Sequence, residues 1–352
     1  MKPTILVVSS VHPPDDPRIR HKLVETLRTH AQVTLCVRSP GPASTDGIYL
    51  SVLRGPRVVR ALEASRLLVV GGYDIASVHD PELLPAAILA GLLGNHVVFD
   101  LHEDLPAQLL TKPSIPGVLR PTASWIARAM LKLAERFVEI SLAEANYAGR
   151  FHKPHPVFPN HLVDIPAVAA SPADRDGIVY LGDITEQRGA ETAVKAVAAM
   201  ATPQRLTFIG RCTAELQSRL ETTARDGGVD VTFTGFLPPR RALPIVAEHR
   251  VGISPLHDVP NYRSSMPTKL LEYLAMGVPV VASDLAGSRS ALAGAAGIVW
   301  VPPADVASLT VALQDAVVDD ALADAALAQA PDVSRNYRWP ADAVRAFYLG
   351  IA

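Results

Sequence analysis

The chain contains only two cysteines, Cys36 and Cys212, among its 352 residues. Two cysteines this far apart support neither a disulfide framework nor a zinc site, so a reduced compartment is expected. The formal net charge is only −2, so no general basic field points to nucleic acid as a partner. No run of about 18 uninterrupted apolar residues indicates a transmembrane helix. The apolar run near the N-terminus is too short for a secretory signal peptide, and we therefore expect a cytoplasmic protein.

Short β-rich segments alternate with longer helical patterns along the whole chain. The candidate strands are mostly continuous apolar runs, at residues 5–9, 32–38, 75–79, 97–102, 137–141, 178–181, 206–210, 231–234, 251–255 and 278–283. Such runs are typical of parallel strands that helices cover on both faces. The alternation predicts an α/β fold of βαβ units in two parallel sheets, whose ligands collect at the carboxyl ends of the strands. A segment rich in Pro, Ala and Asp, residues 159–173, predicts a linker between the two halves.

Residues 255–284 combine a polar loop, a helix start and a buried strand. Pro267 suits the first position of a helix, and Thr268, Lys269 and Glu272 then fall on roughly one face of its first turns. Free N–H groups at a helix start bind anions, a lysine adds charge for a phosphate, and Glu272 can accept two sugar hydroxyls. The alternative is an ordinary amphipathic helix with a Lys/Glu pair on its exposed face.

This segment also resembles the donor-binding motif of the retaining family-4 glycosyltransferases of GT-B fold, in the subgroup that reads P-x-K-x-x-E-Y-x-A-x-G-x-P-V-V. The matching residues are Pro267, Lys269, Glu272, Tyr273, Ala275, Gly277, Pro279, Val280 and Val281. The wider family usually has a second glutamate eight residues before the matched one, where this chain has Ser264. We therefore expect Ser264 to lie near the cleft but not to take the role of that glutamate.

The resemblance implies two Rossmann-like domains whose parallel sheets face each other across a cleft. Residues 1–160 would bind the acceptor and residues 161–336 the nucleotide sugar. The last segment, residues 337–352, is helical in pattern and would cross back onto the first domain.

Polar residues 100–104 follow a predicted strand of the first half. The resemblance implies that His102 lies near the transferred sugar and supports the transition state. Glu103 and Asp104 could orient an acceptor hydroxyl or act as a base. The plainer alternative is a solvated acidic loop that contains one histidine.

Two other loops of the first half contain candidate residues. Asp80 is expected to cap a helix, and acceptor contact by the adjacent His79 is a secondary hypothesis. In the loop after the first strand, Asp16 is also expected to be a cap, while His12 and Arg18 could face the cleft.

In the second half, Gly182 and Arg188 belong to a polar loop that precedes a helix, a plausible clamp for a diphosphate. The family commonly has an arginine directly after the glycine, where this chain has Asp183, so we expect Asp183 to point away, cap a helix or meet a cationic acceptor. Residues 235–238 match a G-x-h-P loop, and the resemblance implies that the backbone near Leu237 meets the nucleobase. The same resemblance assigns phosphate contacts to Ser265 and Met266 at the helix start.

Residues 120–137 have an amphipathic pattern with two stripes. One stripe carries cations at positions that differ by four or eight residues: Arg120, Arg128, Lys132 and Arg136. An apolar stripe runs beside it, formed by Trp125, Ala129, Leu133 and Phe137. Such a helix could lie on an anionic membrane surface, which would make the protein peripheral to the inner face of the membrane. More often a helix of this kind buries its apolar face in its own domain.

The resemblance implies transfer of a hexosyl-type sugar from a nucleoside diphosphate to an acceptor hydroxyl, with retention of configuration. Neither a metal nor a cofactor is expected beyond the nucleotide sugar and an unidentified acceptor, and no obligatory protein partner is implied. Two alternatives stay open: a GT-B enzyme such as a nucleotide-sugar 2-epimerase, and a lapsed nucleotide-sugar-binding protein. Ser264 and Asp183 are the departures that keep the second alternative open.

Overall fold

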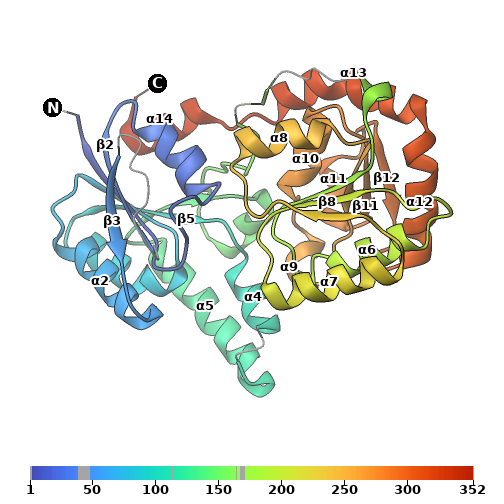
Figure 1. Ribbon diagram of the computed structural model, residues 1–352. Coiled ribbons are helices and arrows are strands. Elements are labelled where there is room, and N and C mark those ends of the chain that lie inside the picture. The colour runs from blue at the N-terminus through green and yellow to red at the C-terminus, as the bar shows by residue number, and fades with distance from the viewer. Residues whose placement is uncertain (1, 39–47, 113–114, 164, 167–170, 352) are drawn as a thin grey trace. The chain divides into compact units, whose positions relative to one another are not determined.

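The computed structural model describes residues 2–38, 48–112, 115–163, 165–166 and 171–351. The chain divides into two compact units, one of residues 1–160 with 339–352 and the other of residues 161–338. Each unit is built around a six-stranded sheet with helices between its strands (Figure 1). The predicted fold class, α/β with two parallel Rossmann-like sheets, is confirmed.

The sheet of the first unit has the strand order β3-β2-β1-β4-β5-β6, and all neighbouring strands are parallel. Its strands are β1 (Thr4–Val8), β2 (Gln32–Arg38), β3 (Tyr49–Leu53), β4 (Ile75–Val78), β5 (His96–Leu101) and β6 (Glu139–Leu142). The helical segments of this unit are η1 (Ile19–Val24), α1 (Glu25–Leu27), α2 (Arg57–Val70), η2 (Pro81–Leu83), α3 (Leu84–Leu92), α4 (Leu105–Thr111), η3 (Gly117–Leu119), α5 (Arg120–Ala134), η4 (Ala145–Arg150) and α14 (Ala341–Leu349).

The C-terminal helix α14 belongs to the first unit, as the sequence analysis predicted. It packs on α1 and η1, and Trp339 just before it donates a hydrogen bond of 3.0 Å from Nε1 to the Thr26 hydroxyl. The hydroxyls of Tyr348 and Ser77 lie 3.0 Å apart, which ties α14 to β4.

The sheet of the second unit has the order β12-β11-β10-β7-β8-β9 and is also parallel throughout. Its strands are β7 (Ile178–Leu181), β8 (Leu206–Ile209), β9 (Val231–Phe233), β10 (Val251–Ser254), β11 (Val280–Ser283) and β12 (Ile298–Val301). The helical segments of this unit are η5 (Pro172–Asp174), α6 (Ala190–Ala198), α7 (Ala214–Asp226), α8 (Pro239–Ala247), α9 (Pro260–Arg263), α10 (Thr268–Ala275), α11 (Ala286–Ala291), α12 (Val306–Val318) and α13 (Asp320–Asn336).

The apolar runs of the inner strands are buried on both faces. β1, β4, β7 and β10 are almost entirely buried, because helices cover both sides of each sheet. Burying one such Val, Leu or Ile side chain contributes about 1.5–3 kcal/mol. No helix among the residues described is both long enough and apolar enough to span a bilayer.

Two strands were not predicted from the sequence, β3 and β12, and both lie at sheet edges. β3 is only partly buried, so it lacks the continuous apolar run by which the inner strands were found. In the predicted linker, Asp164 and residues 167–170 lie outside the described residues.

The prediction for residues 120–137 needs a correction. α5 buries a stripe of small residues and one leucine: Ser124, Ala127, Leu131 and Ala134. Most of the apolar stripe that was expected to be buried is instead exposed, including Trp125 and Leu133, and only Phe137 packs partly against the core. Small side chains allow α5 to pack closely on α4, where the Ser124 hydroxyl donates to the Pro106 carbonyl at 2.9 Å, so this stripe faces inward.

Candidate functional site

Two cations lie beside the backbone of Gly182, Arg188 from the loop after β7 and Lys269 from α10. This glycine has φ +104°, a conformation that residues with a side chain rarely adopt. A Cβ placed on it would lie 3.7 Å from Cε of Lys269 and 3.8 Å from Nη1 of Arg188. The absence of a side chain therefore leaves room beside both cations at the carboxyl end of β7.

Lys269 is the most unusual group of this loop region. It lies in the first turn of α10, is only 5% exposed, and its ammonium has no hydrogen-bond partner among the residues described. Nζ lies 4.0 Å from the centre of the Tyr180 ring. Burial, and then the nearby Arg188 charge, lower the pKa of Lys269 to about 7. An unpaired buried ammonium is costly, so an anion at this position would stabilise it.

The alternative of an ordinary exposed Lys/Glu pair is wrong for Lys269, because the side chain is buried. Glu272 is half-buried one turn later, and its charge opposes the lowering of the lysine pKa. Thr268 is the first residue of α10 and Pro267 is its N-cap, so the helix begins one residue later than predicted.

Tyr273 and Gly252 explain why α10 sits so close to the sheet. The buried Tyr273 hydroxyl accepts a hydrogen bond of 2.7 Å from the Leu181 N–H, and lies 3.2 Å from the carbonyls of Val179 and Ile253. A Cβ on Gly252 would come within 2.6 Å of the Tyr273 ring. The motif tyrosine therefore anchors the helix start that carries Lys269, and Gly252, which the sequence analysis did not identify, makes the space.

The loop before α10 is also fixed. The Ser265 N–H donates to the Tyr262 carbonyl at 3.3 Å, and the Ser265 carbonyl accepts from the Ser288 hydroxyl at 3.3 Å. A Cβ on Gly287 would overlap the backbone of Ser264. Ser264 is exposed, whereas Ser265 and Met266 are half-buried.

Other predicted residues of the second unit lie at strand ends. The Arg188 guanidinium lies 5.8 Å from the centre of the Tyr262 ring. The Asp183 carboxylate lies 3.8 Å from the Arg211 guanidinium, so its neighbour in the structure is a cation of the protein itself, which was not among the expected partners. Leu237, in the loop after β9, is half-buried and packs against the core.

In the first unit, a buried ion pair organises the candidate residues. The Asp100 carboxylate at the end of β5 accepts two hydrogen bonds of 2.8 Å from the Arg18 guanidinium and one of 2.9 Å from the Ser141 hydroxyl. Burial alone would raise the pKa of Asp100, but Arg18 holds it well below its usual range. The prediction that Arg18 faces a cleft is wrong, because its remaining N–H groups turn inward to the Phe158 carbonyl at 3.0 Å.

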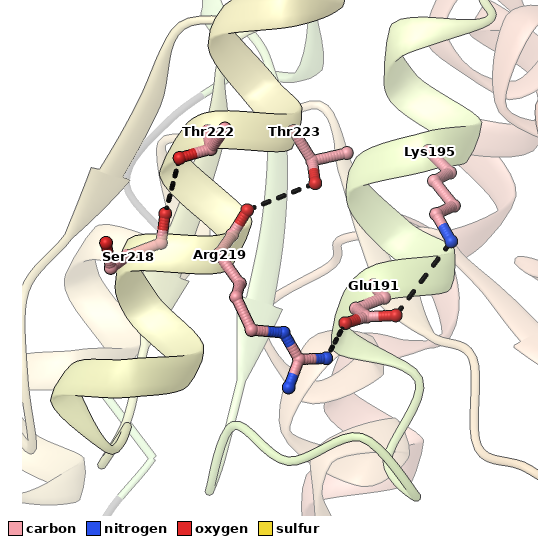
Figure 2. A pocket seen from close by; sticks show the side chains of 6 residues that line it. All are labelled: Glu191, Lys195, Ser218, Arg219, Thr222 and Thr223. Atoms are coloured by element: carbon pink, nitrogen blue, oxygen red, sulfur yellow. Dashed lines mark hydrogen bonds and ion pairs between the residues drawn. The ribbon is translucent and has the colours of Figure 1, made fainter.

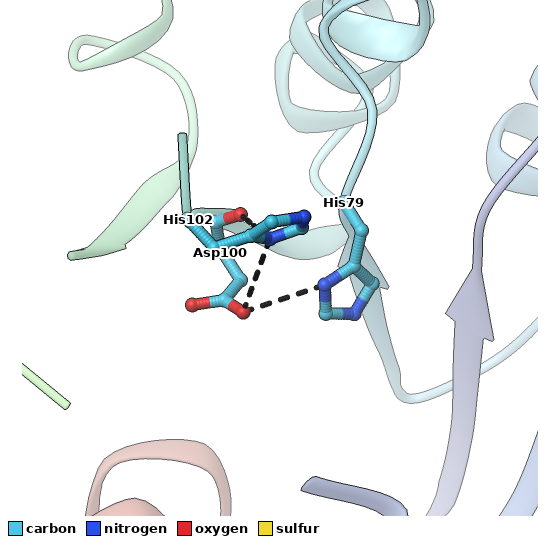
Figure 3. A group of neighbouring side chains, drawn as sticks. All are labelled: His79, Asp100 and His102. Atoms are coloured by element: carbon cyan, nitrogen blue, oxygen red, sulfur yellow. Dashed lines mark hydrogen bonds and ion pairs between the residues drawn. The ribbon is translucent and has the colours of Figure 1, made fainter. Parts of the chain in front are cut away.

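Three histidines surround this ion pair. His79 Nδ1 and His102 Nδ1 lie 3.4 and 3.8 Å from one Asp100 oxygen (Figure 3). His102 Nε2 lies 3.3 Å from His12 Nε2. His79 is fully buried, and burial lowers its pKa. His12 Nδ1 lies 2.8 Å from Asp16, which raises the pKa of His12 despite burial.

The ligand atoms of His79, Asp100 and His102 lie within 4.8 Å of one another, as a metal site requires. The Arg18 guanidinium, however, already neutralises the Asp100 carboxylate and would repel a cation. We therefore assign no metal to this group.

The acidic candidates of this unit have structural contacts. Asp104 caps α4 by accepting from the Ala107 N–H at 3.3 Å, and it pairs with Arg150 at 2.6 Å. Glu103 is exposed and accepts a hydrogen bond from Gln108. A cavity of about 350 Å³ is lined by His12, His79, His102 and Glu103 among others.

Asp80 occupies the N-cap position of η2, as predicted, but its side chain does not cap the helix. Its side chain makes no cap hydrogen bond and instead accepts from the Ser10 N–H at 2.5 Å and the Ser9 hydroxyl at 2.9 Å. The loop after β1 lies beside Asp80 because β1 and β4 are neighbours, so the carboxylate holds the loop that carries His12. Asp16 does act as expected, accepting from the N–H groups of Arg18 and Ile19 at 2.9 Å each.

A second cavity of about 350 Å³ lies on the outer side of α6 and α7 (Figure 2). Its charged groups pair with one another: Arg219 pairs with Glu191, and Lys195 lies 3.9 Å from Glu191. Helix faces rather than strand ends line it, so we assign no ligand to it.

Comparisons with known proteins bear on both units. Residues 175–319 match the family model described as glycosyl transferases group 1. A sequence search of curated proteins gave no match.

Among solved structures, the sucrose-phosphate synthase of Thermosynechococcus elongatus is similar, with 17% identity, a TM-score of 0.72, and coverage of 99% of this chain and 98% of that one. Anabaena Alr3699/HepE in complex with UDP and glucose shares 15% identity with a TM-score of 0.73 and 98% coverage of both chains. WaaG, a glycosyltransferase involved in lipopolysaccharide biosynthesis, shares 13% identity with a TM-score of 0.71 and covers 99% of this chain and 100% of its own. These likenesses show the GT-B fold and, with the family match, support a glycosyltransferase of that fold.

Proposed function

We propose that the protein is a retaining glycosyltransferase that moves a sugar from a nucleoside diphosphate to an acceptor hydroxyl without a metal ion. The match of residues 175–319 and the GT-B fold support the class of reaction. The second unit would bind the nucleotide sugar, and the first unit would bind the acceptor. The two lone cysteines favour a cytoplasmic location.

The observation that carries this proposal is the buried Lys269 ammonium, which has no hydrogen-bond partner among the described residues. Arg188 lies close enough to depress its pKa, so two cations converge beside the Gly182 backbone. A diphosphate is the chemical group that would relieve the repulsion between them. The start of α10 adds the positive end of the helix dipole beside the same anion.

The reaction follows from this charge distribution. The bond between the sugar C1 and the diphosphate oxygen breaks, and Lys269 and Arg188 stabilise the charge that develops on the leaving group. The acceptor oxygen forms its bond to C1 on the same face, and its proton passes to the departing diphosphate. Glu272 would hold the ribose, the backbone near Leu237 the base, and His102 would support the transition state.

The test is calorimetric binding of UDP, GDP, dTDP and ADP, each with and without magnesium, followed by product analysis. Anabaena Alr3699/HepE has been solved in complex with UDP-glucose, so UDP-glucose is the first donor to test. We expect one nucleotide to bind equally well without magnesium, and free nucleoside diphosphate to form only when an acceptor is present. Release without acceptor would favour an epimerase, and binding without any turnover a lapsed protein. No binding of any nucleotide would contradict the donor site itself.

A further inference from the structure

Three helices of the first unit, α2, α3 and α5, form a continuous layer. α2 packs on α3, and α3 packs on α5. They connect strands that follow one another across the sheet in one direction, and right-handed connections then place all three on the same side. α2 and α5 can be followed in Figure 1. We call the outer surface of this layer the α2–α3–α5 face.

Large apolar side chains project from the α2–α3–α5 face. On α5, Trp125 is 68% exposed, and Ile126 and Leu133 are also exposed. Leu62 on α2 is 67% exposed, and Leu92 on α3 is 59% exposed. Large contiguous apolar patches are rare on monomeric soluble proteins and mark contact sites, and we interpret the apolar side chains of these adjacent helices as one such site.

The charges on the α2–α3–α5 face are mostly of one sign. Arg128 and Lys132 on α5 and Arg136 just after it are exposed, and they make no ion pair with any residue that the structure describes. The acid on this stretch, Glu135, is buried and accepts hydrogen bonds from the N–H groups of His152 and Lys153. Its charge is therefore not available to balance the three exposed cations.

The neighbouring helices add little negative charge. α3 has no charged residue. α2 carries an exposed Arg66 against one exposed acid, Glu63. The face therefore presents exposed cations close to exposed tryptophan and leucine side chains.

We propose that the α2–α3–α5 face docks on the surface of a bilayer that contains anionic lipids. Tryptophan and leucine would insert at the level of the headgroups, and the cations beside them would contact lipid phosphates. The positive charge favours a membrane over a second copy of this chain. A two-fold interface would bring the same unpaired cations of both copies together, and they would repel each other. The inference does not depend on the proposed transfer reaction.

The experiment is co-sedimentation of the full chain with vesicles of phosphatidylcholine alone and with vesicles that also contain phosphatidylglycerol. We expect binding to the anionic vesicles, weakened by salt. Because each cation near such a surface strengthens binding several-fold, Arg128→Glu with Lys132→Glu should weaken partitioning about tenfold or more. Trp125→Ser with Leu133→Ser should weaken the binding that persists at high salt.

Matched controls come from the second unit. Arg225→Glu and Val318→Ser change an exposed cation and an exposed apolar residue of α7 and α12, and both should leave vesicle binding unchanged. Circular dichroism and thermal unfolding check that each variant folds. The proposal is overturned if binding ignores lipid charge or if the controls lose it equally. It is also overturned if sedimentation velocity shows self-association that the α5 variants abolish, because the occupant would then be a second copy.

Discussion

Asp100 in the first unit and Lys269 in the second are both buried charged groups beside the carboxyl ends of strands. Only Asp100 forms a hydrogen-bonded ion pair with a residue of opposite charge. Asp100 receives a bidentate Arg18 and the Ser141 hydroxyl. Lys269 faces an aromatic ring and a second cation, and its ammonium has no hydrogen-bond partner among the described residues. The first arrangement stabilises the fold and orients histidines. The second leaves a buried positive charge that a bound anion would neutralise.

The largest expected effect comes from breaking the compensated charge. Arg18→Met leaves Asp100 buried without its counter-charge and should lower the free energy of unfolding of the first unit by about 3–5 kcal/mol. Arg57→Met, which breaks the half-exposed pair of Arg57 with Glu82, should cost less than about 1 kcal/mol. Hydrogen exchange of the β5 amides reports on this unit alone. Equal effects of the two substitutions would remove the contrast between a buried and a surface pair.

The side chain of His102 offers a test that separates the two units by function. If the first unit supports the transition state while the second binds the donor, His102→Ala should lower turnover by about 100-fold or more with little change in nucleotide affinity. Stopped assays for nucleoside diphosphate release, together with calorimetry on the same variant, measure both quantities. Near-normal turnover would exclude His102 from the reaction centre.

A smaller effect should appear as a pH dependence. The pKa of Lys269 is about 7 in the free protein, and a bound diphosphate would favour its charged form. Above about pH 7, binding should therefore take up a proton, and affinity should fall by up to about tenfold per pH unit. Calorimetry in two buffers with different heats of ionisation detects that proton. A binding heat that is independent of the buffer at alkaline pH would contradict this account.

The lowered pKa of Lys269 also determines how the stability of the fold changes with pH. The folded pKa of Lys269 lies below its ordinary value of 10.5, so between about pH 7 and 10.5 the unfolded chain binds more protons than the folded one. This lysine therefore destabilises the fold most below about pH 7, and the penalty fades as the pH rises towards 10.5.

The sequence indicates local features of the second unit better than those of the first. The motif from Pro267 to Val281 is continuous, so its helix start, its anchoring tyrosine and its buried strand could be located from one segment. Burial of Lys269 could not, because it depends on Tyr180, which lies on another strand.

In the first unit, the residues that matter are far apart in the chain. Asp100 pairs with Arg18 across 82 positions, and Asp80 binds the loop at Ser10 across 70. Local rules therefore placed Asp80 at its N-cap position but missed the loop that its side chain binds, and they assigned Arg18 to a cleft. A charged residue within the apolar run of β5 was the signal that could have identified Asp100.

The most direct test of the central claim is calorimetric binding of the nucleoside diphosphate to Lys269→Met, with Lys195→Met on the exposed side of α6 as the control. A hydrogen-bonded ion pair with a phosphate contributes about 1.5–3 kcal/mol, so the affinity of Lys269→Met should fall about 10- to 150-fold while the control binds normally. The ligand-free Lys269→Met protein should be at least as stable as the parent, because an unpaired buried charge has been removed. Unchanged affinity, or a fold destabilised as severely as by Arg18→Met, would contradict the assignment of Lys269 as an uncompensated charge that awaits a diphosphate.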